Sequence, residues 1–476
     1  MDVTAPANVL LITLDQFRGD ALSCASHPLV KTPHLDALAS AGVRFACHYT
    51  QSTPCAPGRA GLYTGMYQMN HRVVANGTPL DDRFDNVARL AQRSGRQGAL
   101  FGYTDQSVDP RITLHADDPR LQTYEGLLPG FTWELDLTGP HRPWVDFLKA
   151  NGYDVSAGHM HLLATEHERP VEHSVSRFMT DNLIDWLENQ TTTTQAPWFA
   201  HASYLRPHPP YSAPRDFTSM YDPADVGMPI TPSSDRHPFH DVLFGVSAVT
   251  APSDEAEMRY MRSQYFAMIS AVDAEMGRLW DALKRLGAWE NTVIIVTADH
   301  GEQLGDHGLK DKVGWFEQSH HIPLLWRDPF QTATHGSVVQ HFTESVDVLP
   351  TLAEVWGQPM PLQCDGHSLT SFLQGATPHI WREAASWEFD WRSALIPHVN
   401  NQWPWDDRLT TSHLAVHRTQ DTAYVQFGDG SYLCFDIALD PTWRTPVTDP
   451  QRILDMAQRM LVWRSCHTNR THSGLL

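Results

Sequence analysis

The run Val9-Leu-Leu-Ile-Thr-Leu14 is almost wholly apolar and leads directly into Asp15 and Gln16. A second run, Asn291-Thr-Val-Ile-Ile-Val-Thr-Ala298, leads in the same way into Asp299 and His300. Short runs of this kind are typical of strands buried on both faces of a parallel sheet. Ligands of such sheets bind beyond the carboxyl ends of the strands, so the two carboxylates mark a candidate site. An Asp at a strand end is also common in ordinary turns, and further motifs must separate the two interpretations.

Helix and strand patterns alternate up to about residue 375. Residues 32–42 predict a helix with Thr32 as its cap and Gly42 as its end. Residues 97–101 and 198–203 predict strands, and residues 255–286 predict a long helix with room for a break. The alternation predicts an α/β sandwich around a large, mostly parallel sheet.

The pattern changes after residue 375. Residues 414–417, 423–427 and 432–436 have the composition of short strands, and Gly428-Asp-Gly430 is typical of a hairpin turn. Residues 450–464 have helical spacing. We therefore expect a large catalytic domain over residues 1–375. A smaller α+β domain with an antiparallel sheet should follow over residues 376–476.

Composition limits the class of protein. The 476 residues exceed the usual size of a single core, and 55 acidic against 35 basic residues give a net charge of −20. That charge argues against nucleic acid and anionic membranes as partners, and an anionic substrate would need cations at its site. The six cysteines are sparse and predict no disulfide framework. No signal peptide and no apolar run of about 20 residues is apparent, so we expect a cytoplasmic protein.

A reactive motif lies between the two strands. Pro54-Cys55-Ala-Pro-Gly-Arg59 contains Cys-x-Pro-x-Arg, and Arg206-Pro-His208-Pro-Pro210 and Lys312 follow it. Together with Asp15-Gln16, Asp299-His300 and Asp306-His-Gly308, these segments resemble the sulfatase family of the alkaline phosphatase superfamily. They are most similar to phosphonate monoester hydrolases and their arylsulfatase relatives. The resemblance runs from about residue 8 to 330 and implies an alkaline-phosphatase-like fold.

The resemblance implies two cofactors. The first is formylglycine, which a separate formylglycine-generating enzyme would make from Cys55. The second is one divalent metal ion, with ligands Asp15, Gln16, Asp299, His300 and the oxygen of the converted Cys55. Carboxylate and amide oxygens suit a hard ion such as Ca²⁺, while the imidazole favours Mn²⁺, so both ions stay open.

The resemblance also implies roles around the nucleophile. Arg59 would hold it, and His208 would protonate the leaving oxygen with help from Lys312. The expected substrate-binding residues are Asn76, Tyr103 and Thr104. Each has a simpler interpretation: a loop histidine is commonly exposed, Lys310 competes with Lys312, and Asn76 before Gly77 could be a turn.

Two departures from the family pattern bear on function. Tyr63-Thr-Gly-Met66 lacks the arginine that often ends this segment in the family. The difference bears on recognition by the maturation enzyme more than on catalysis. Asp105 stands where relatives often carry threonine. An acid there would repel a dianion more than a mono-anion. We therefore expect mono-anionic esters as substrates and disfavour phosphate monoesters.

The functional prediction is formylglycine- and metal-dependent hydrolysis of sulfate monoesters, with promiscuous hydrolysis of phosphonate monoesters and phosphodiesters. The alternative makes the phosphorus esters the primary substrates. Two other rivals are a metal phosphatase whose Cys55 stays a thiol and a silent binding protein of the same fold. The partners would be a small anionic ester and, through the Trp- and Pro-rich C-terminal segment, a second copy in a dimer or tetramer. Some tryptophans there could instead line an aryl pocket; they include Trp387, Trp391, Trp403 and Trp405.

Overall fold

The computed structural model describes residues 8–113, 115–193, 196–392 and 411–468. Its larger sheet has eight strands. In spatial order they are β5 (Phe131–Asp136), β4 (Gln97–Gly102), β6 (Trp198–Tyr204), β1 (Asn8–Leu14), β7 (Thr292–Thr297), β8 (Leu324–Arg327), β2 (Val43–Tyr49) and β9 (Ser337–Glu344). The first five are parallel, β8 is antiparallel to both its neighbours, and β2 and β9 are parallel. The large, mostly parallel sheet is confirmed.

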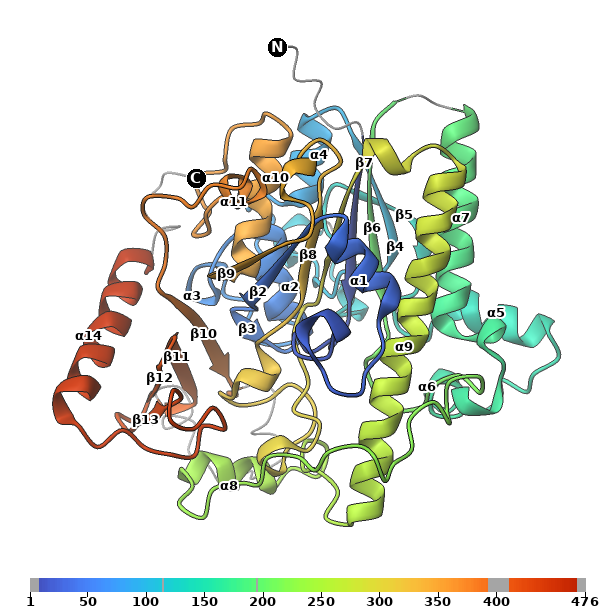
Figure 1. The fold of residues 1–476 in the computed structure, drawn as a ribbon. Helices are drawn as coiled ribbons and strands as arrows, with labels where there is room; N and C mark the ends of the chain where they lie inside the picture. The colour runs from blue at the N-terminus through green and yellow to red at the C-terminus, as the bar shows by residue number, and fades with distance from the viewer. Residues whose placement is uncertain (1–7, 114, 194–195, 393–410, 469–476) are drawn as a thin grey trace.

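Helices cover both faces of this sheet (Figure 1). Alternate residues of β1 show why, because Leu10 and Ile12 belong to one apolar core while Val9 and Leu11 belong to the other. The first core packs against α1 (Pro33–Ser40), α7 (Val175–Thr193) and α9 (Glu255–Arg285). The second packs against α2 (Cys55–Thr64), α4 (Val87–Arg93), α10 (Val348–Val355) and α11 (Thr370–Leu373). Among the residues that the structure describes, the other α-helices are α3 (Gln68–His71), α5 (Arg142–Ala150), α6 (His159–Ala164), α8 (Pro238–Phe244) and α14 (Pro450–His467).

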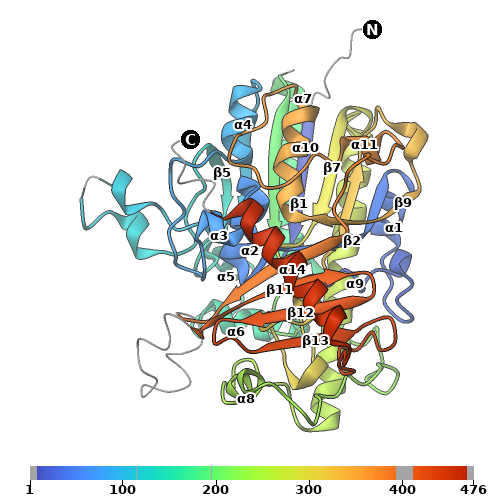
Figure 2. The ribbon, with the colours of Figure 1, turned by 90° about the vertical axis from the view of Figure 1, so that its left-hand side faces the viewer.

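The smaller sheet is the expected C-terminal one, with an addition. Its strands, in order, are β13 (Tyr432–Asp436), β12 (Thr422–Phe427), β11 (His413–Thr419), β10 (Ala384–Asp390) and β3 (Ser52–Thr53). The first four are antiparallel, and β3 pairs parallel to β10. Figure 2 shows α14 lying across the face of this sheet, where Met456, Met460 and Trp463 are buried. Because β3 ends two residues before Cys55, the smaller sheet helps to position the reactive segment.

The predicted domain boundary after residue 375 falls between α11 and β10. It stays a prediction, because β3 ties the N-terminal part of the chain to the smaller sheet. Trp387 and Trp391 are buried in the core between this sheet and α8. Trp403 and Trp405 lie outside the described residues.

Some local predictions were wrong in detail. Thr32 precedes α1, but its hydroxyl donates to Asp36 (3.1 Å) and does not cap the backbone. Gly42 does not end the helix, which stops at Ser40; it is glycine because a side chain there would collide with the Trp326 carbonyl (2.5 Å). The helix α9 runs for 31 residues without a break. Within the described part of the chain, no helix is long and apolar enough to cross a membrane.

Candidate active site

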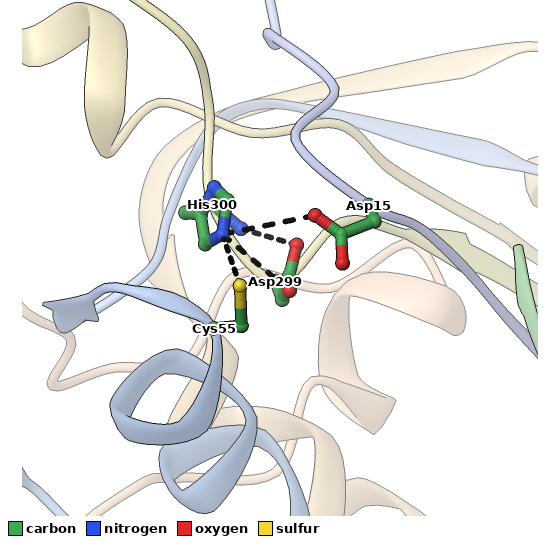
Figure 3. A group of neighbouring side chains, drawn as sticks. All are labelled: Asp15, Cys55, Asp299 and His300. Carbon is green, nitrogen blue, oxygen red and sulfur yellow. Dashed lines mark hydrogen bonds and ion pairs between the residues drawn. The ribbon is translucent and has the colours of Figure 1, made fainter. Parts of the chain in front are cut away.

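Strand ends and a helix start meet at one edge of the larger sheet. Asp15 follows β1, Asp299 and His300 follow the neighbouring β7, and Cys55 is the first residue of α2. Figure 3 shows the four side chains converging. One ligand atom from each lies within 4.8 Å of all the others, and all four residues are buried. The coincidence of the two strand ends is therefore a built cluster and not a pair of ordinary turns.

His300 presents one ring nitrogen to this cluster. Its Nδ1 donates to the Gly301 carbonyl (3.0 Å), because a carbonyl can only accept. Nε2 therefore carries the lone pair, and it lies 3.3 Å from Cys55 Sγ and 3.8 Å from Asp15 Oδ1. Burial lowers the pKa of His300, although Asp299 and Asp15 oppose the shift. A neutral imidazole held by a carbonyl is the form that binds metal ions.

Asp15 supplies the clearest sign that the cluster is built to bind a cation. Its Oδ2 accepts from Arg59 Nη2 (3.0 Å) and from the Tyr103 hydroxyl (2.8 Å). Its Oδ1 is buried and has no hydrogen-bond partner among the described residues. Burial opposes ionisation, but the cationic groups around Asp15 hold its pKa well below the usual range. An ionised carboxylate oxygen buried without a partner is costly, and a metal ion would satisfy it. The donor set therefore fits a divalent ion.

Gln16 stands beside the cluster with its amide already bonded. Its Oε1 accepts from Lys312 Nζ (2.8 Å), and its Nε2 donates to Glu302. Its backbone is in the left-handed region (φ 67°), and its N–H donates to Asp299 Oδ1 (3.2 Å). The structure thus brings Gln16 to the site, with its side-chain oxygen shared with Lys312.

Arg59 joins the carboxylates of the cluster to each other. It is fully buried, and it contacts Asp299 Oδ2 (Nε, 2.9 Å) and Asp15 Oδ2 (Nη2, 3.0 Å). Its Nη1 donates to Ser203 Oγ (2.7 Å) on β6. Burial disfavours the charged form of Arg59, but Asp299 and the other nearby anions outweigh it and raise the pKa of Arg59 above its ordinary value. Its observed role is to hold two expected metal ligands one turn of helix from Cys55.

His208 and Lys312, which the sequence predicts to act together, lie in direct contact. Lys312 Nζ lies 2.8 Å from His208 Nε2, and His208 Nδ1 donates to the Pro209 carbonyl (2.7 Å). Burial and the adjacent Lys312 lower the pKa of His208 to about 4. Burial opposes the charge of Lys312, but Asp311 and other anions hold its pKa well above the ordinary value. At neutral pH the proton between the two nitrogens therefore resides on Lys312, whose Nζ donates a hydrogen bond to His208 Nε2.

These residues surround a cavity of about 170 Å³. The cavity is lined by Asp15, Cys55, Asn76, Tyr103, Asp105, Tyr124, Glu125, Gly139, His141, His159, Met160, Leu163, Leu205, His208, Pro209 and Lys312. Asn76 Oδ1 accepts from the Ala56 backbone N–H (2.9 Å), which leaves its NH₂ group as the donor for an anion. Lys310 is not among the lining residues. Of the two lysines, the structure therefore brings Lys312 to the cavity, and its catalytic role stays a prediction.

Tyr103 and Thr104 differ in where the structure places them. Tyr103 lines the cavity, but its hydroxyl is committed to Asp15. Thr104 does not line the cavity. Its hydroxyl donates to the Gly126 carbonyl (2.5 Å) and accepts from the Leu128 N–H (3.1 Å), so it fixes a loop and is not placed to touch a substrate.

Asp105 does not oppose an anion as a bare charge. Its Oδ2 lies 3.3 Å from Arg59 Nε, and its backbone has φ 52°. Burial raises the pKa of Asp105 to about 8, with Arg59 opposing the shift. The acid that departs from the family pattern therefore lines the cavity as a largely protonated group at neutral pH, and it pairs with Arg59 as a carboxylate above about pH 8.

Sequence reasoning missed several residues that support the site. Glu302 accepts from Gln16 and from the backbone N–H groups of Leu304 (2.7 Å) and Asp311 (2.5 Å), so it shapes the loop that carries Lys312. The Tyr265 hydroxyl donates to the Gln16 carbonyl (2.8 Å) from α9. Of these two residues only Glu302, which directly follows Asp299, His300 and Gly301, left a signal in the sequence.

Comparison with known proteins agrees with this geometry. A family model described as Sulfatase matches residues 7–357. The multifunctional alkaline phosphatase superfamily protein PehA of Trinickia caryophylli is 35% identical over 98% of this chain and 96% of its own length. The phosphonate monoester hydrolase of Agrobacterium radiobacter superposes with a TM-score of 0.88 at 38% identity, covering 97% of this chain and 96% of that chain. SpPMH, the phosphonate monoester hydrolase from Silicibacter pomeroyi, gives 0.87 at 33% identity, with 98% and 97% covered.

The fold, the buried cluster and these matches lead to the same assignment. The protein is an ester hydrolase with an alkaline-phosphatase-like fold, and its site can hold a metal ion. The family match covers most of the chain and includes every expected catalytic residue. The chain belongs to the sulfatase family.

Proposed function

We propose that this protein hydrolyses mono-anionic esters with a divalent metal ion and a formylglycine made from Cys55. Phosphonate monoesters and phosphodiesters come first among its substrates, and sulfate monoesters follow. The observation that carries the proposal is the buried cluster of Asp15, Cys55, Asp299 and His300, of which Asp15 and Cys55 line the same cavity as Lys312.

The order of substrates reverses the one predicted from sequence. Two structures with phosphonate monoester hydrolase in their names resemble this chain at 38% and 33% identity over nearly its whole length. Sulfate and phosphonate monoesters carry one negative charge each. Their transition states place charge on the same oxygens, so one site can serve both. Broad activity is therefore part of the proposal.

The choice of a mono-anion rests on the charges around the cavity. Asp15 and Asp299 share the single charge of Arg59, and Asp105, which is largely neutral below about pH 8, lies beside them. Lys312 is the cation whose side chain lines the cavity. Asp15 and Asp299 would also balance the charge of a divalent ion bound beside them. A second negative charge on the substrate would therefore find little further compensation, and we expect dianionic phosphate monoesters to react poorly.

The metal would be held by Asp15, Asp299, His300 and the converted Cys55, with Gln16 adjoining. Bound there, it would neutralise charge on the ester oxygens and lower the pKa of the hydroxyl that attacks from residue 55. The ligand set favours Ca²⁺ or Mn²⁺.

The remaining steps fall to side chains that the structure shows. Arg59 fixes Asp15 and Asp299, and so keeps the cluster in one geometry. Asn76 donates its NH₂ group to an oxygen of the substrate. Lys312 Nζ carries a proton and donates a hydrogen bond to His208 Nε2, and this pair protonates the leaving oxygen.

The rival function, a phosphatase whose Cys55 stays a thiol, is separated by one variant set. Wild type, Cys55→Ala and the control Cys466→Ala, which changes an exposed cysteine, are produced with a formylglycine-generating enzyme. Each is assayed with p-nitrophenyl phenylphosphonate, bis(p-nitrophenyl) phosphate, p-nitrophenyl sulfate and p-nitrophenyl phosphate. We expect the first two to give the highest kcat/KM, the sulfate to follow and the phosphate monoester to be slowest. Activity that survives in Cys55→Ala, or a preference for the phosphate monoester, would overturn the proposal.

We also propose that the protein is a cytoplasmic homo-oligomer. The outer face of α14 exposes Leu454, Leu461 and Val462, of which Leu461 is 65% exposed. Exposed apolar side chains grouped on one helix are typical of an interface between subunits. Light scattering at micromolar concentration should give the mass of a dimer or tetramer, and a monomer would contradict this part of the proposal.

A further inference from the structure

The cavity above Cys55 contains hydrogen-bond acceptors that the proposed chemistry does not use. Two of them, His141 and Glu125, come from segments that flank β5, and both line the cavity. Lys312 and Asn76 suit the anionic centre of an ester. An acceptor group suits a different part of the substrate, because it needs a donor opposite it.

The ring of His141 is fixed in one tautomer by its neighbours. Nδ1 donates to the Leu137 carbonyl (2.6 Å), so that nitrogen carries the hydrogen. Nε2 makes no hydrogen bond to any residue that the structure describes, and as the second nitrogen of a neutral imidazole it is an acceptor. Burial lowers the pKa of His141 to about 4, which keeps the ring neutral.

The backbone at His141 is unusual as well. Its φ is 51°, a conformation that residues other than glycine seldom adopt, and the residue precedes α5 without capping it. Non-glycine residues in this region cost energy and cluster at ligand sites. The ring also lies edge-on to His159, with centroids 5.6 Å apart, which narrows its freedom to rotate.

Glu125 supplies a carboxylate next to this histidine. It accepts from the backbone N–H of Gly139, two residues before His141. That bond leaves acceptor sites on a carboxylate that has about four. The apolar side chains of Met160, Leu163 and Leu205 line the same cavity and can pack against methylene groups.

We propose that His141 and Glu125 bind a protonated amine on the organic group that stays attached to the phosphorus atom of a phosphonate or phosphodiester substrate. A carboxylate and a neutral imidazole acceptor together complement the charge and the N–H donors of an ammonium group. The substrate would then be a zwitterion, with its anionic centre at Lys312 and Asn76 and its ammonium at His141 and Glu125. This inference rests on the proposed ester hydrolysis and adds its substrate class.

The test uses p-nitrophenyl esters of four phosphonates that differ in one substituent. The substituents are propyl, 2-hydroxyethyl, 2-aminoethyl and 2-(trimethylammonio)ethyl, so the leaving group is constant and propyl matches aminoethyl in size. Wild-type enzyme should favour aminoethyl over propyl by about tenfold to a hundredfold in kcat/KM, the range expected for hydrogen bonds to charged groups. Hydroxyethyl should fall between them. The trimethylammonio ester, which has the charge but no N–H donor, should be poorer than aminoethyl.

Two variants and a control assign the preference to the named residues. Glu125→Gln keeps an acceptor for the Gly139 N–H, and His141→Asn introduces a residue that tolerates positive φ. Both should bring the aminoethyl-to-propyl ratio toward one. Glu134→Gln, which removes an exposed carboxylate on β5, should leave the ratio as in wild type.

Each outcome decides the inference. Equal turnover of all four esters by wild type, or an unchanged ratio in both variants, would overturn it and leave the proposed hydrolysis intact. If none of the four esters is hydrolysed by enzyme with converted Cys55, the proposed function fails and this inference fails with it.

Discussion

Lys312 and His208 should behave in kinetics as one catalytic group. Their nitrogens lie 2.8 Å apart and share one proton, with Lys312 as donor and His208 as acceptor. General acid catalysis contributes about 10²–10⁴-fold to rate, and removing either residue breaks the same proton path. Lys312→Met and His208→Asn should therefore each lower kcat/KM by about 10²–10⁴-fold. Residues that act as a unit are strongly non-additive, so the double variant should lose little beyond the worse single change.

The assay measures kcat/KM for aryl phosphonates whose phenols differ in pKa. Poor leaving groups should suffer most in both variants, because they depend most on the proton. Lys310→Met, which removes a lysine two positions away and outside the cavity, is the matched control and should retain activity. Losses that multiply in the double variant, or that do not depend on the leaving group, would refute the shared-proton account.

Three further predictions concern stability and charge. Arg59→Met should lower the free energy of unfolding by about 3–5 kcal/mol in chemical denaturation of the metal-free protein, because it leaves Asp15 and Asp299 buried without their partner; a loss under about 1 kcal/mol would contradict the role of Arg59. Asp105→Asn should raise kcat/KM for p-nitrophenyl phosphate relative to the phosphonate. The gain should be larger above pH 8, because the pKa of Asp105 is about 8 and its negative charge appears above that value. A gain seen only at acidic pH would contradict this charge effect. Burial lowers the pKa of His71 to about 3, so as the pH falls the unfolded chain takes up a proton on this residue before the folded chain does. The contribution of neutral His71 to the free energy of unfolding is therefore complete above the ordinary pKa of about 6.5. It should fall by about 1.4 kcal/mol per pH unit as the pH drops from there toward 3. His71→Gln, compared with wild type by denaturation at several pH values, should flatten that slope, and an unchanged slope would argue against the assignment.

The strands and their carboxyl ends could be predicted because both signals are local. Val9 to Leu14 is buried on both faces of the sheet, and this burial makes the run continuously apolar. The α/β class and the smaller antiparallel sheet followed from similar short patterns. The contribution of β3 could not be predicted, because a two-residue strand that pairs with β10 across more than 300 positions leaves no periodic signal.

The candidate site divides along the same line. Which residues gather at the site followed from motifs, and the structure brings Asp15, Cys55, Asp299 and His300 together. What each hydroxyl or amide bonds to depends on contacts between distant segments. The hydrogen bond from the Thr104 hydroxyl to the Gly126 carbonyl could therefore not be predicted from the local sequence. His141 and Glu125 carried no motif, because an acceptor at a cavity wall is defined by its neighbours.

The conversion of Cys55 is the central claim, and one peptide tests it directly. Trypsin cuts after Arg44 and Arg59, which gives a peptide of residues 45–59 that contains both Cys47 and Cys55. In active enzyme treated with iodoacetamide after unfolding, we predict that Cys47 is alkylated while residue 55 carries an aldehyde that reacts with a hydrazide. A fully active preparation in which both cysteines of this peptide are alkylated would contradict the account.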